Sequence, residues 1–263
     1  MDLGLRGRVA LVTGASQGLG RAVALVLARE GCRLVVSSRR PDAIERAAGE
    51  IRDETGSEVM AVAADVGVAE DVNRLVAAAV EGYGGIDVLV ANAGGPRAGA
   101  FAALSDEDWA AALGVTLMGT IRLIRGSVAS MRQRGGGRIA VIASSGVREP
   151  IEGLVLSNAV RGGIPGLIKN LAWEYGRDGI LCNVIAPGRF ATPRVEDLDR
   201  GRAQAAGASL SQWRSSVERG IAVGRYGEPE ELGRAVAFAV SWANTYMTGH
   251  TLLVDGGLTR GVW

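Results

Sequence analysis

Residues 9–20, which read VALVTGASQGLG, decide the fold of this chain. The β-branched run at 9–13 is typical of a buried strand, and the residues after the glycines open a helix. Between them, glycines allow a tight turn and a close approach of the backbone to a pyrophosphate, whose charge the N-terminus of a helix stabilises. A glycine pattern in this strand–turn–helix order predicts a dinucleotide-binding βαβ unit.

Six further short apolar runs follow along the chain, separated by helix-compatible segments. They are RLVVS (33–37), VMAVA (59–63), IDVLVA (86–91), RIAVIA (138–143), ILCNVI (180–185) and TLLV (251–254). Alternation of this kind predicts an α/β fold, a Rossmann-like, doubly wound parallel sheet of about seven strands with helices on both faces. Because the chain has 263 residues, 48% of them hydrophobic, we expect residues 1–263 to form a single domain.

Residues 193–226 interrupt this alternation with a polar, arginine-rich segment that contains Trp213. The segment follows the sixth predicted strand, so it lies at the carboxyl edge of the sheet, where such sheets bind ligands. Long loops in compact domains are commonly functional. We therefore expect a loop that serves as a substrate lid at about 193–226, and the alternative is a surface loop without a role in binding.

The composition favours a small-molecule partner. The formal charge is +1 and charged residues are scattered, so we expect neither nucleic acid nor a membrane as partner. A single histidine, His250, gives a metal cluster or a Ser-His nucleophile little support, and Cys32 and Cys182 lie in apolar runs, as reduced thiols do. We expect no metal. Without a signal-peptide core or an apolar segment long enough to span a bilayer, we also expect a cytoplasmic protein.

The end of the second predicted strand indicates which nicotinamide cofactor is bound. An acidic residue there hydrogen-bonds the ribose 2′-hydroxyl of NAD(H) and repels a 2′-phosphate, whereas arginine accepts the phosphate. The chain has Ser38, Arg39 and Arg40 at this point and no acidic residue before Asp42. We therefore predict NADP(H), and the alternative for one of the arginines is a solvated residue at a helix start.

The glycine motif TGxxxGxG at 13–20 resembles that of the short-chain dehydrogenase/reductase family, and further family motifs follow in order over nearly the whole chain. The resemblance implies that Asp65 and Val66 contact the adenine, that residues 92–94 line the cofactor cleft and that residues 187–192 hold the nicotinamide amide. The cofactor-binding residues that we expect are Gly14, Ser16, Gln17, Gly18, Leu19, Gly20, Ser38, Arg39, Arg40, Asp65, Val66, Asn92, Ala93, Gly94, Arg161, Pro187, Gly188 and Thr192.

The same resemblance implies four catalytic positions: a serine that holds the carbonyl, a tyrosine that donates the proton, a lysine one helical turn further, and an asparagine that supports a water relay. Ser144 matches the serine, but Ser157 stands at the tyrosine position, Arg161 at the lysine position and Thr116 at the asparagine position. The flanking motifs AWE (172–174) and GILCN (179–183) support this alignment. The chain is thus similar to an atypical member of the family that lacks the Tyr-x-x-x-Lys pair.

The chemistry of the replacements leaves the proton donor open. Ser157 and Arg161 are four residues apart and share a helix face. Arginine can anchor ribose hydroxyls and stabilise an alkoxide, but its high pKa makes it a poor proton donor. The candidates are a water held by the serines and Arg161, Glu152 if burial raises its pKa, and, more remotely, Tyr226.

Pro165 lies four residues after Arg161 and cannot donate an amide hydrogen to the Arg161 carbonyl. We expect a kink or a local widening of the helix there. One interpretation is that the distortion aims the guanidinium at the cofactor, and the other is that the small residues around Pro165 allow close packing across a subunit interface.

Three functions remain compatible with these residues. The leading hypothesis is an NADP(H)-dependent oxidoreductase that reduces a ketone or 3-oxoacyl-like carbonyl by hydride transfer with a non-standard proton relay. The second is a non-redox enzyme that performs an elimination, cyclisation or aldol-type step in the same pocket. The third is a catalytically inactive NADP(H)-binding regulatory protein. The resemblance also implies a homotetramer or homodimer through the long helices that begin near Asp106 and Val155. Arg97, Arg148 and Arg189 hint at an anionic or polar substrate group.

Overall fold

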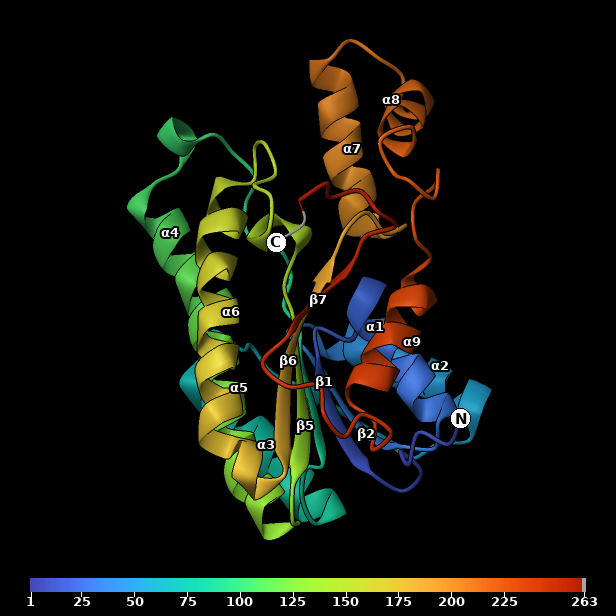
Figure 1. Cartoon of the computed structure of the whole chain (residues 1–263), viewed down its shortest axis with the longest axis vertical. Helices are drawn as coiled ribbons and strands as arrows, with labels where there is room; N and C mark the ends of the chain where they lie inside the picture. Colours follow the sequence, from blue (N-terminus) through green and yellow to red (C-terminus); the bar gives the residue numbers. More distant parts are fainter. Residues whose placement is uncertain (262–263) are drawn as a thin grey trace.

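The computed structural model describes residues 1–261 and has at its centre one parallel sheet in the order β3-β2-β1-β4-β5-β6-β7 (Figure 1). All seven predicted strands are confirmed, with shifts of a few residues at their ends. The strands are β1 (Val9–Thr13), β2 (Arg33–Ser38), β3 (Val59–Ala63), β4 (Val88–Ala91), β5 (Gly137–Ile142), β6 (Ile180–Pro187) and β7 (Thr251–Val254).

Helices cover both faces of the sheet, as the alternating pattern predicts (Figure 1). On one face lie α1, α2 and α9, and on the other lie α3, α4, α5 and α6. Their bounds are α1 (Gly18–Arg29), α2 (Pro41–Thr55), α3 (Ala69–Tyr83), η1 (Phe101–Ala103), α4 (Asp106–Ala112), η2 (Leu113–Met118), α5 (Gly119–Gln133), η3 (Ser145–Val147), α6 (Val155–Tyr175), η4 (Gly176–Asp178), α7 (Pro193–Ala205), α8 (Leu210–Glu218) and α9 (Pro229–Ala239).

Two apolar layers hold this arrangement together. Every residue of β1 and β4 is buried, because a central parallel strand is covered on both faces and carries apolar side chains in both directions. One layer packs α1 and α9 against the sheet through residues such as Val23, Leu27 and Val236. The other packs α3, α5 and α6 through residues such as Leu75, Leu123 and Ile164. The sheet is therefore a rigid base for the loops at its carboxyl edge.

A wide helical turn interrupts the long helical run Asp106–Gln133. The run consists of α4, the π-helical turn η2 and α5. Contrary to the sequence-based expectation, its length of 28 residues and the mean hydropathy of 1.2 of its most apolar 18-residue window would suffice to cross a membrane, but the run packs on the sheet of the fold. π-Turns of this kind are common at functional sites, and this one contains Thr116.

The α6 helix is continuous from Val155 to Tyr175 although Pro165 lies inside it. The widening predicted near Arg161 is therefore wrong, and the widened turn lies in η2 instead. The kink predicted as the other possibility, and with it the interpretation that Pro165 aims the guanidinium at the cofactor, stays a prediction. Gly162, Gly163 and Gly166 have open space around them, as the alternative of close packing with a further chain requires.

The segment after β6 consists mainly of two helices, α7 and α8, and the prediction of a loop is wrong here. Thr192 caps α7 by accepting a hydrogen bond from the Val195 amide, and Pro193 occupies the first turn, where its missing N–H costs nothing. Ser209 and Gln212 form a reciprocal capping box at the start of α8. Both helices stand at the carboxyl edge of the sheet, above β6 and β7 in Figure 1.

Candidate active site

The turn between β1 and α1 has the shape that a dinucleotide requires. Gly14 has φ 61° and Gly18 has φ 58°, a region that favours glycine. A Cβ atom at Gly20 would lie 2.2 Å from the Gly14 carbonyl oxygen, so only glycine lets the helix begin this close to the strand. The amides of the first helical turn then face the carboxyl edge, where they can bind a phosphate.

Asn92, at the end of β4, fixes this turn from the neighbouring strand. Its side-chain amide donates to the carbonyl oxygens of Thr13 and Gly14, both at 3.2 Å. Its backbone amide donates to the Thr13 hydroxyl at 3.0 Å, and that hydroxyl donates to the Asn92 carbonyl at 2.8 Å. The expected residues Asn92 to Gly94 therefore lie directly beside the glycine turn, on the floor of one cleft.

The end of β2 adds a basic rim to this cleft. The Ala15 amide donates to the Ser37 carbonyl at 3.0 Å, which holds the glycine turn against β2. Beyond it, Arg39 and Arg40 are exposed, and neither forms an ion pair within the described residues 1–261. Two free guanidinium groups and no carboxylate at this point suit a 2′-phosphate.

The other expected cofactor residues lie along the same edge. Asp65 accepts a hydrogen bond from the Gly67 amide at 2.8 Å, and the buried Val66 packs beside Gly119 of α5. Gly188 lies so close to Asp255 that a Cβ atom would come within 2.5 Å of the Asp255 Cβ, which ties the turn after β6 to the C-terminal motif. Thr192 reaches back to Gly18, so the base of α7 adjoins the glycine turn.

Ser144 directly follows β5 and presents a hydroxyl that can donate. Its Oγ atom accepts a hydrogen bond from the Gly146 amide at 3.1 Å, which leaves the hydroxyl hydrogen free. Gly146 is enclosed by two side chains, because a Cβ atom there would lie 3.3 Å from Ser144 Oγ and 2.5 Å from Asn158 Oδ1. Ser144 is thus adjacent to the first turn of α6, where Ser157 lies.

Ser157 and Arg161 form a buried pair on α6. Each side chain has a relative exposure of 7%, and Arg161 Nη1 donates to Ser157 Oγ at 2.7 Å. The four-residue spacing that the sequence shows is therefore a direct contact. A hydroxyl that accepts from a guanidinium is polarised by the positive charge, so its own hydrogen becomes a stronger donor.

The Arg161 guanidinium is buried without a neutralising charge. Its Nε atom has no hydrogen-bond partner, and it forms no ion pair within residues 1–261. Burial lowers its pKa from the ordinary value of an arginine to about 10, and the positive charge of Arg194 acts in the same direction. No carboxylate contributes to this shift. A buried cation of this kind is costly unless a ligand supplies hydrogen-bond acceptors and negative charge.

Thr116 lies next to α6 from the other side. It is 4% exposed, and its Oγ1 atom has no hydrogen-bond partner. Its neighbour Leu117 packs against Leu156 and Val160 of α6. Because η2 is a wide turn, Thr116 is held against α6.

Unpartnered buried polar atoms concentrate at this edge. Within the part of the chain that the structure describes, the buried side-chain nitrogen and oxygen atoms without a partner are Ser37 Oγ, Thr116 Oγ1 and Arg161 Nε. Native proteins leave few such atoms, and each calls for a binding or catalytic explanation. Two of the three, Thr116 and Arg161, are residues that the sequence predicts for the active site.

Helices α7 and α8 stand at the carboxyl edge of the sheet and are organised around Asp199. This carboxylate is fully buried and accepts hydrogen bonds from Arg189 Nη1 at 2.7 Å, Trp213 Nε1 at 3.2 Å and the Tyr226 hydroxyl at 2.7 Å. The sequence analysis missed Asp199, because a single aspartate in a polar segment carries no pattern. One buried acid thus joins the turn after β6, both helices and the segment before α9.

Two arginines of α7 connect this helix to the loops around the site. Arg194 Nη2 donates to the Pro96 carbonyl at 2.7 Å, and Arg202 Nη2 donates to the Glu152 carbonyl at 2.6 Å. The two loops also meet each other, since the Gly99 amide donates to the Gly153 carbonyl at 2.8 Å. The loop after β4, the segment before α6 and helix α7 are therefore brought together.

The alternative proton donors do not lie free in the site. The Glu152 side chain is exposed, and its backbone carbonyl accepts a hydrogen bond from Arg202. Burial and the hydrogen bond to Asp199 raise the pKa of Tyr226, whose hydroxyl is engaged. Lys169 is exposed further along α6, and Tyr175 lies at the far end of that helix. A water bound by the serines and Arg161 remains.

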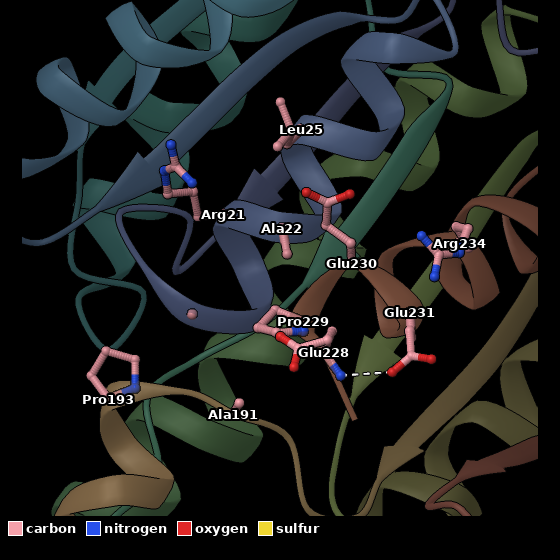
Figure 2. Close-up of a pocket in the computed structure, with 11 residues that line it drawn as sticks. Arg21, Ala22, Leu25, Ala191, Pro193, Glu228, Pro229, Glu230, Glu231 and Arg234 are labelled. Carbon is pink, nitrogen blue, oxygen red and sulfur yellow. Dashed lines mark hydrogen bonds between the residues drawn. The ribbon is translucent and has the colours of Figure 1, made fainter. Parts of the chain in front are cut away.

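A separate cavity of about 590 Å³ lies behind the glycine turn, between α1 and α9 (Figure 2). Gly18 and Pro193 line it, but none of the four catalytic candidates does. Its other lining residues include Arg21, Arg234 and three glutamates of the α9 start, so it carries both charges. We therefore place the functional cleft at the carboxyl edge rather than in this cavity.

The chain is similar to known proteins over nearly its whole length. A family model described as enoyl-(acyl carrier protein) reductase matches residues 14–259. Short chain dehydrogenase/reductase astE of Aspergillus oryzae is 35% identical over 257 residues, which are 97% of this chain and 96% of its own length.

Solved structures are similar over the same length. L-sorbose reductase from Gluconobacter frateurii, complexed with NADPH and L-sorbose, is 33% identical, covers 100% of both chains and has a TM-score of 0.95. An NADPH-bound short chain oxidoreductase from Pseudomonas aeruginosa PAO1, described as containing an atypical catalytic center, is 29% identical, covers 97% of this chain and 98% of its own, and has a TM-score of 0.88.

Proposed function

The chain belongs to the short-chain dehydrogenase/reductase family, and from this premise we propose that it is an NADP(H)-dependent reductase of a ketone or 3-oxoacyl-like carbonyl with a non-standard proton relay. The observation that carries the proposal is the buried Ser157–Arg161 pair next to Ser144. It offers hydrogen-bond donors and a positive charge where an alkoxide would form.

The cofactor is NADP(H). The glycine turn leaves space for a pyrophosphate, the end of β2 supplies Arg39 and Arg40 without a carboxylate, and the similar sorbose reductase and Pseudomonas oxidoreductase were solved with NADPH. When bound, NADPH supplies the hydride that reduces the carbonyl carbon. Thr192 and Asn92, which both adjoin the glycine turn after β1, would hold its nicotinamide half.

The roles of the chain's own residues follow from their hydrogen bonds. Ser144 accepts from the Gly146 amide, so its hydroxyl donates to the substrate carbonyl and orients it. Arg161 stabilises the developing alkoxide and hydrogen-bonds ribose hydroxyls through its remaining N–H groups. Ser157, which Arg161 polarises, positions a proton or passes it to the alkoxide, and a bound water then supplies a new proton to Ser157. Thr116 is a further group that can hold this water.

The substitution of the family pair is part of the proposal. Ser157 and Arg161 would replace the tyrosine and lysine that the family resemblance implies, with the same spacing on α6. The Pseudomonas oxidoreductase described as containing an atypical catalytic center supports the view that this fold tolerates a changed site while it binds NADPH.

Turnover distinguishes this proposal from its alternatives. We expect purified protein to bind NADPH, measured by fluorescence, and to consume it with at least one member of a panel of ketones and diketones, measured by absorbance. Ser144→Ala and Arg161→Ala should each lower kcat by about 100-fold, the usual loss when one oxyanion donor is removed. Lys169→Ala, an exposed change further along α6, is the matched control and should leave kcat unchanged.

Tight NADPH binding without consumption by any carbonyl would contradict the proposal. Product formation from a substrate at constant NADPH would favour the non-redox enzyme, and binding without any product would favour the regulatory protein. Equal activity of both alanine variants and the wild type would overturn the site assignment.

We further propose that residues 1–263 act as one dinucleotide-binding domain whose substrate lid is the segment 193–226, and that the enzyme is cytoplasmic and a homodimer or homotetramer. The lid assignment is supported by the hydrogen bonds of Arg194 and Arg202 to the two neighbouring loops. The assembly is supported by apolar side chains left uncovered on η2 and α6, namely Leu113, Met118 and Trp173.

A further inference from the structure

One side chain, that of Asn158, holds the segment between β5 and α6 against the first turn of α6. Its Nδ2 atom donates to the Ile151 carbonyl at 2.8 Å, and its Oδ1 atom accepts from the Ile151 amide at 3.2 Å. Both bonds need a side chain that carries a donor and an acceptor side by side. Asparagine is favoured in caps and turns rather than inside helices, so these two bonds explain its place in α6, directly after Ser157.

Asn158 also contacts the turn that orients Ser144. A Cβ atom at Gly146 would lie 2.5 Å from Asn158 Oδ1, so Gly146 lies directly against the Asn158 amide. The Gly146 amide donates to Ser144 Oγ at 3.1 Å, and the Val147 amide donates to the Ser144 carbonyl at 3.1 Å. The turn η3 is therefore fixed at one end by β5 and at the other by Asn158, which together determine where the Ser144 hydroxyl lies relative to α6.

The bonds to Ile151 also affect the contacts with other segments. The carbonyls of the two residues after Ile151 accept hydrogen bonds from Arg202 of α7 at 2.6 Å and from the Gly99 amide of the loop after β4 at 2.8 Å. A shift of Ile151 would displace both contacts. Asn158 thus connects α7 and the loop after β4 to the helix that carries the Ser157–Arg161 pair.

We propose that Asn158 is a positioning residue that holds the Ser144 hydroxyl at a fixed distance from the Ser157–Arg161 pair. This inference rests on the proposed function, in which Ser144 orients the carbonyl and the pair stabilises the alkoxide. Asn158 acts through Ser144 rather than on the reacting atoms, because its amide is bonded to Ile151. Displacement of a catalytic group by about 1 Å lowers a rate by up to about 100-fold, so the two bonds have a direct effect on kcat.

The variants Asn158→Ala and Asn158→Asp test this role. Alanine removes both hydrogen bonds. Aspartate keeps the shape and the acceptor, but it replaces the donor by a carboxylate oxygen that faces the Ile151 carbonyl. We expect kcat, measured as NADPH consumption with a ketone that the wild type reduces, to fall about 10-fold or more in both variants, while the dissociation constant of NADPH stays within about 2-fold.

Asn170→Ala is the matched control. Asn170 lies on the same helix, and its amide likewise donates to a backbone carbonyl, that of Gly166 at 2.8 Å, but at an exposed position. Its removal should leave kcat unchanged. An equal loss of kcat in Asn170→Ala and Asn158→Ala would contradict the inference, because any amide removed from α6 would then have the same effect.

A double-mutant cycle with Ser144→Ala separates positioning from a general loss of structure. Because Asn158 acts through Ser144, Asn158→Ala should lower kcat by less than about 2-fold once the Ser144 hydroxyl is absent. A merely structural role would lower kcat by the same factor in both backgrounds. Equal factors, or an unchanged kcat in both Asn158 variants, would overturn the inference.

Hydrogen exchange measures the same contact without turnover. Residues 145–154 should exchange faster in both Asn158 variants than in the wild type, while the second half of α6 keeps its protection. Unchanged exchange in this segment would exclude the role even where kcat falls. A wild type that consumes no NADPH contradicts the proposed function instead, and faster exchange in the variants then still supports the position that Asn158 gives to the segment after Ser144.

Discussion

At the scale of single residues, Arg161 is held in a state that is unfavourable for the folded chain alone. Its guanidinium is buried, its Nε atom has no partner, and its pKa falls to about 10. Residues that lower stability in this way are typical of active sites, where they are kept because they bind substrate or stabilise a transition state.

We expect Arg161→Met to stabilise the protein while it reduces activity. A methionine of similar length removes the buried charge and the unsatisfied donor, which should raise the free energy of unfolding by about 2 kcal/mol and the melting temperature by roughly 4–8 °C. Thermal unfolding without ligand measures the effect. A lower melting temperature for Arg161→Met than for the wild type would show that the guanidinium is compensated.

The same stabilisation should depend on pH. The folded pKa of Arg161 is about 10, below the ordinary value of an arginine, so the unfolded chain holds this proton more tightly than the folded one. As the pH rises through about 10, the free energy of unfolding of the wild type therefore rises relative to that of Arg161→Met. The melting temperature of Arg161→Met should exceed that of the wild type by the largest amount at pH 7 and by less at about pH 10.5. The same difference at both pH values would show that the charge of Arg161 is not its cause.

At the scale of elements, the lid depends on Asp199. Three donors from separate segments converge on this one buried carboxylate. Its removal leaves Arg189 and Trp213 without their acceptor, and breaking a buried ion pair is costly.

We expect Asp199→Asn to loosen α7 and α8 without affecting the sheet. Loss of the charge opposite Arg189 should cost the lid about 2–4 kcal/mol. Hydrogen exchange should become faster at 193–218, and KM for the substrate should rise about 10-fold or more while the dissociation constant of NADPH stays within about 2-fold. Tyr226→Phe, which removes one of the three hydrogen bonds, should have a smaller effect of the same kind. Unchanged exchange in Asp199→Asn would exclude this role.

The elements differ in how far the sequence predicts them. The sequence predicts the strands, because buried β-branched runs such as 9–13 recur between helical segments. The lid helices were missed although their start signals, Thr192-Pro193 and the Ser209–Gln212 box, are present in the sequence, because the polar composition of the segment outweighed them. The widening expected at Pro165 lies in η2 instead, where no residue type marks it.

The site shows the same division. Ser144, Ser157 and Arg161 follow from spacing along the chain, and the hydrogen bond between the latter two agrees with their positions on one helix face. Arg194 and Asp199 do not, because their roles depend on segments that are distant in sequence, at Pro96, Arg189 and Tyr226. Contacts of this kind need the folded chain.

At the scale of the whole molecule, the face formed by α5 and α6 carries a groove lined mainly by apolar side chains. A groove between α5 and α6 is lined by Ile121, Ile124, Arg125, Val128, Ala129, Arg132, Leu167, Leu171 and Tyr175. Only 44% of the most apolar stretch of the run Asp106–Gln133 is buried in one chain. Covering such a face with a second copy of the chain would remove it from water.

We expect Leu171→Asp to produce monomers. A carboxylate in the groove would have to be desolvated in the proposed dimer or tetramer, which should weaken association by about 100-fold or more. Light scattering coupled to size exclusion measures the mass. Val80→Asp, an apolar-to-acidic change at an exposed position of α3, is the control and should leave the mass unchanged. A monomeric wild type would contradict the proposed assembly.

The hydrogen bond between the Trp213 indole and Asp199 gives the lid an optical reporter. An indole whose N–H is bonded to a buried carboxylate emits differently from one in water, because the excited-state dipole relaxes in a different field. Displacement of α8 from α7 would break this bond and shift the emission of Trp213. Stopped-flow fluorescence on a chain in which the other tryptophans are replaced by phenylalanine would then time lid closure directly, without an attached dye.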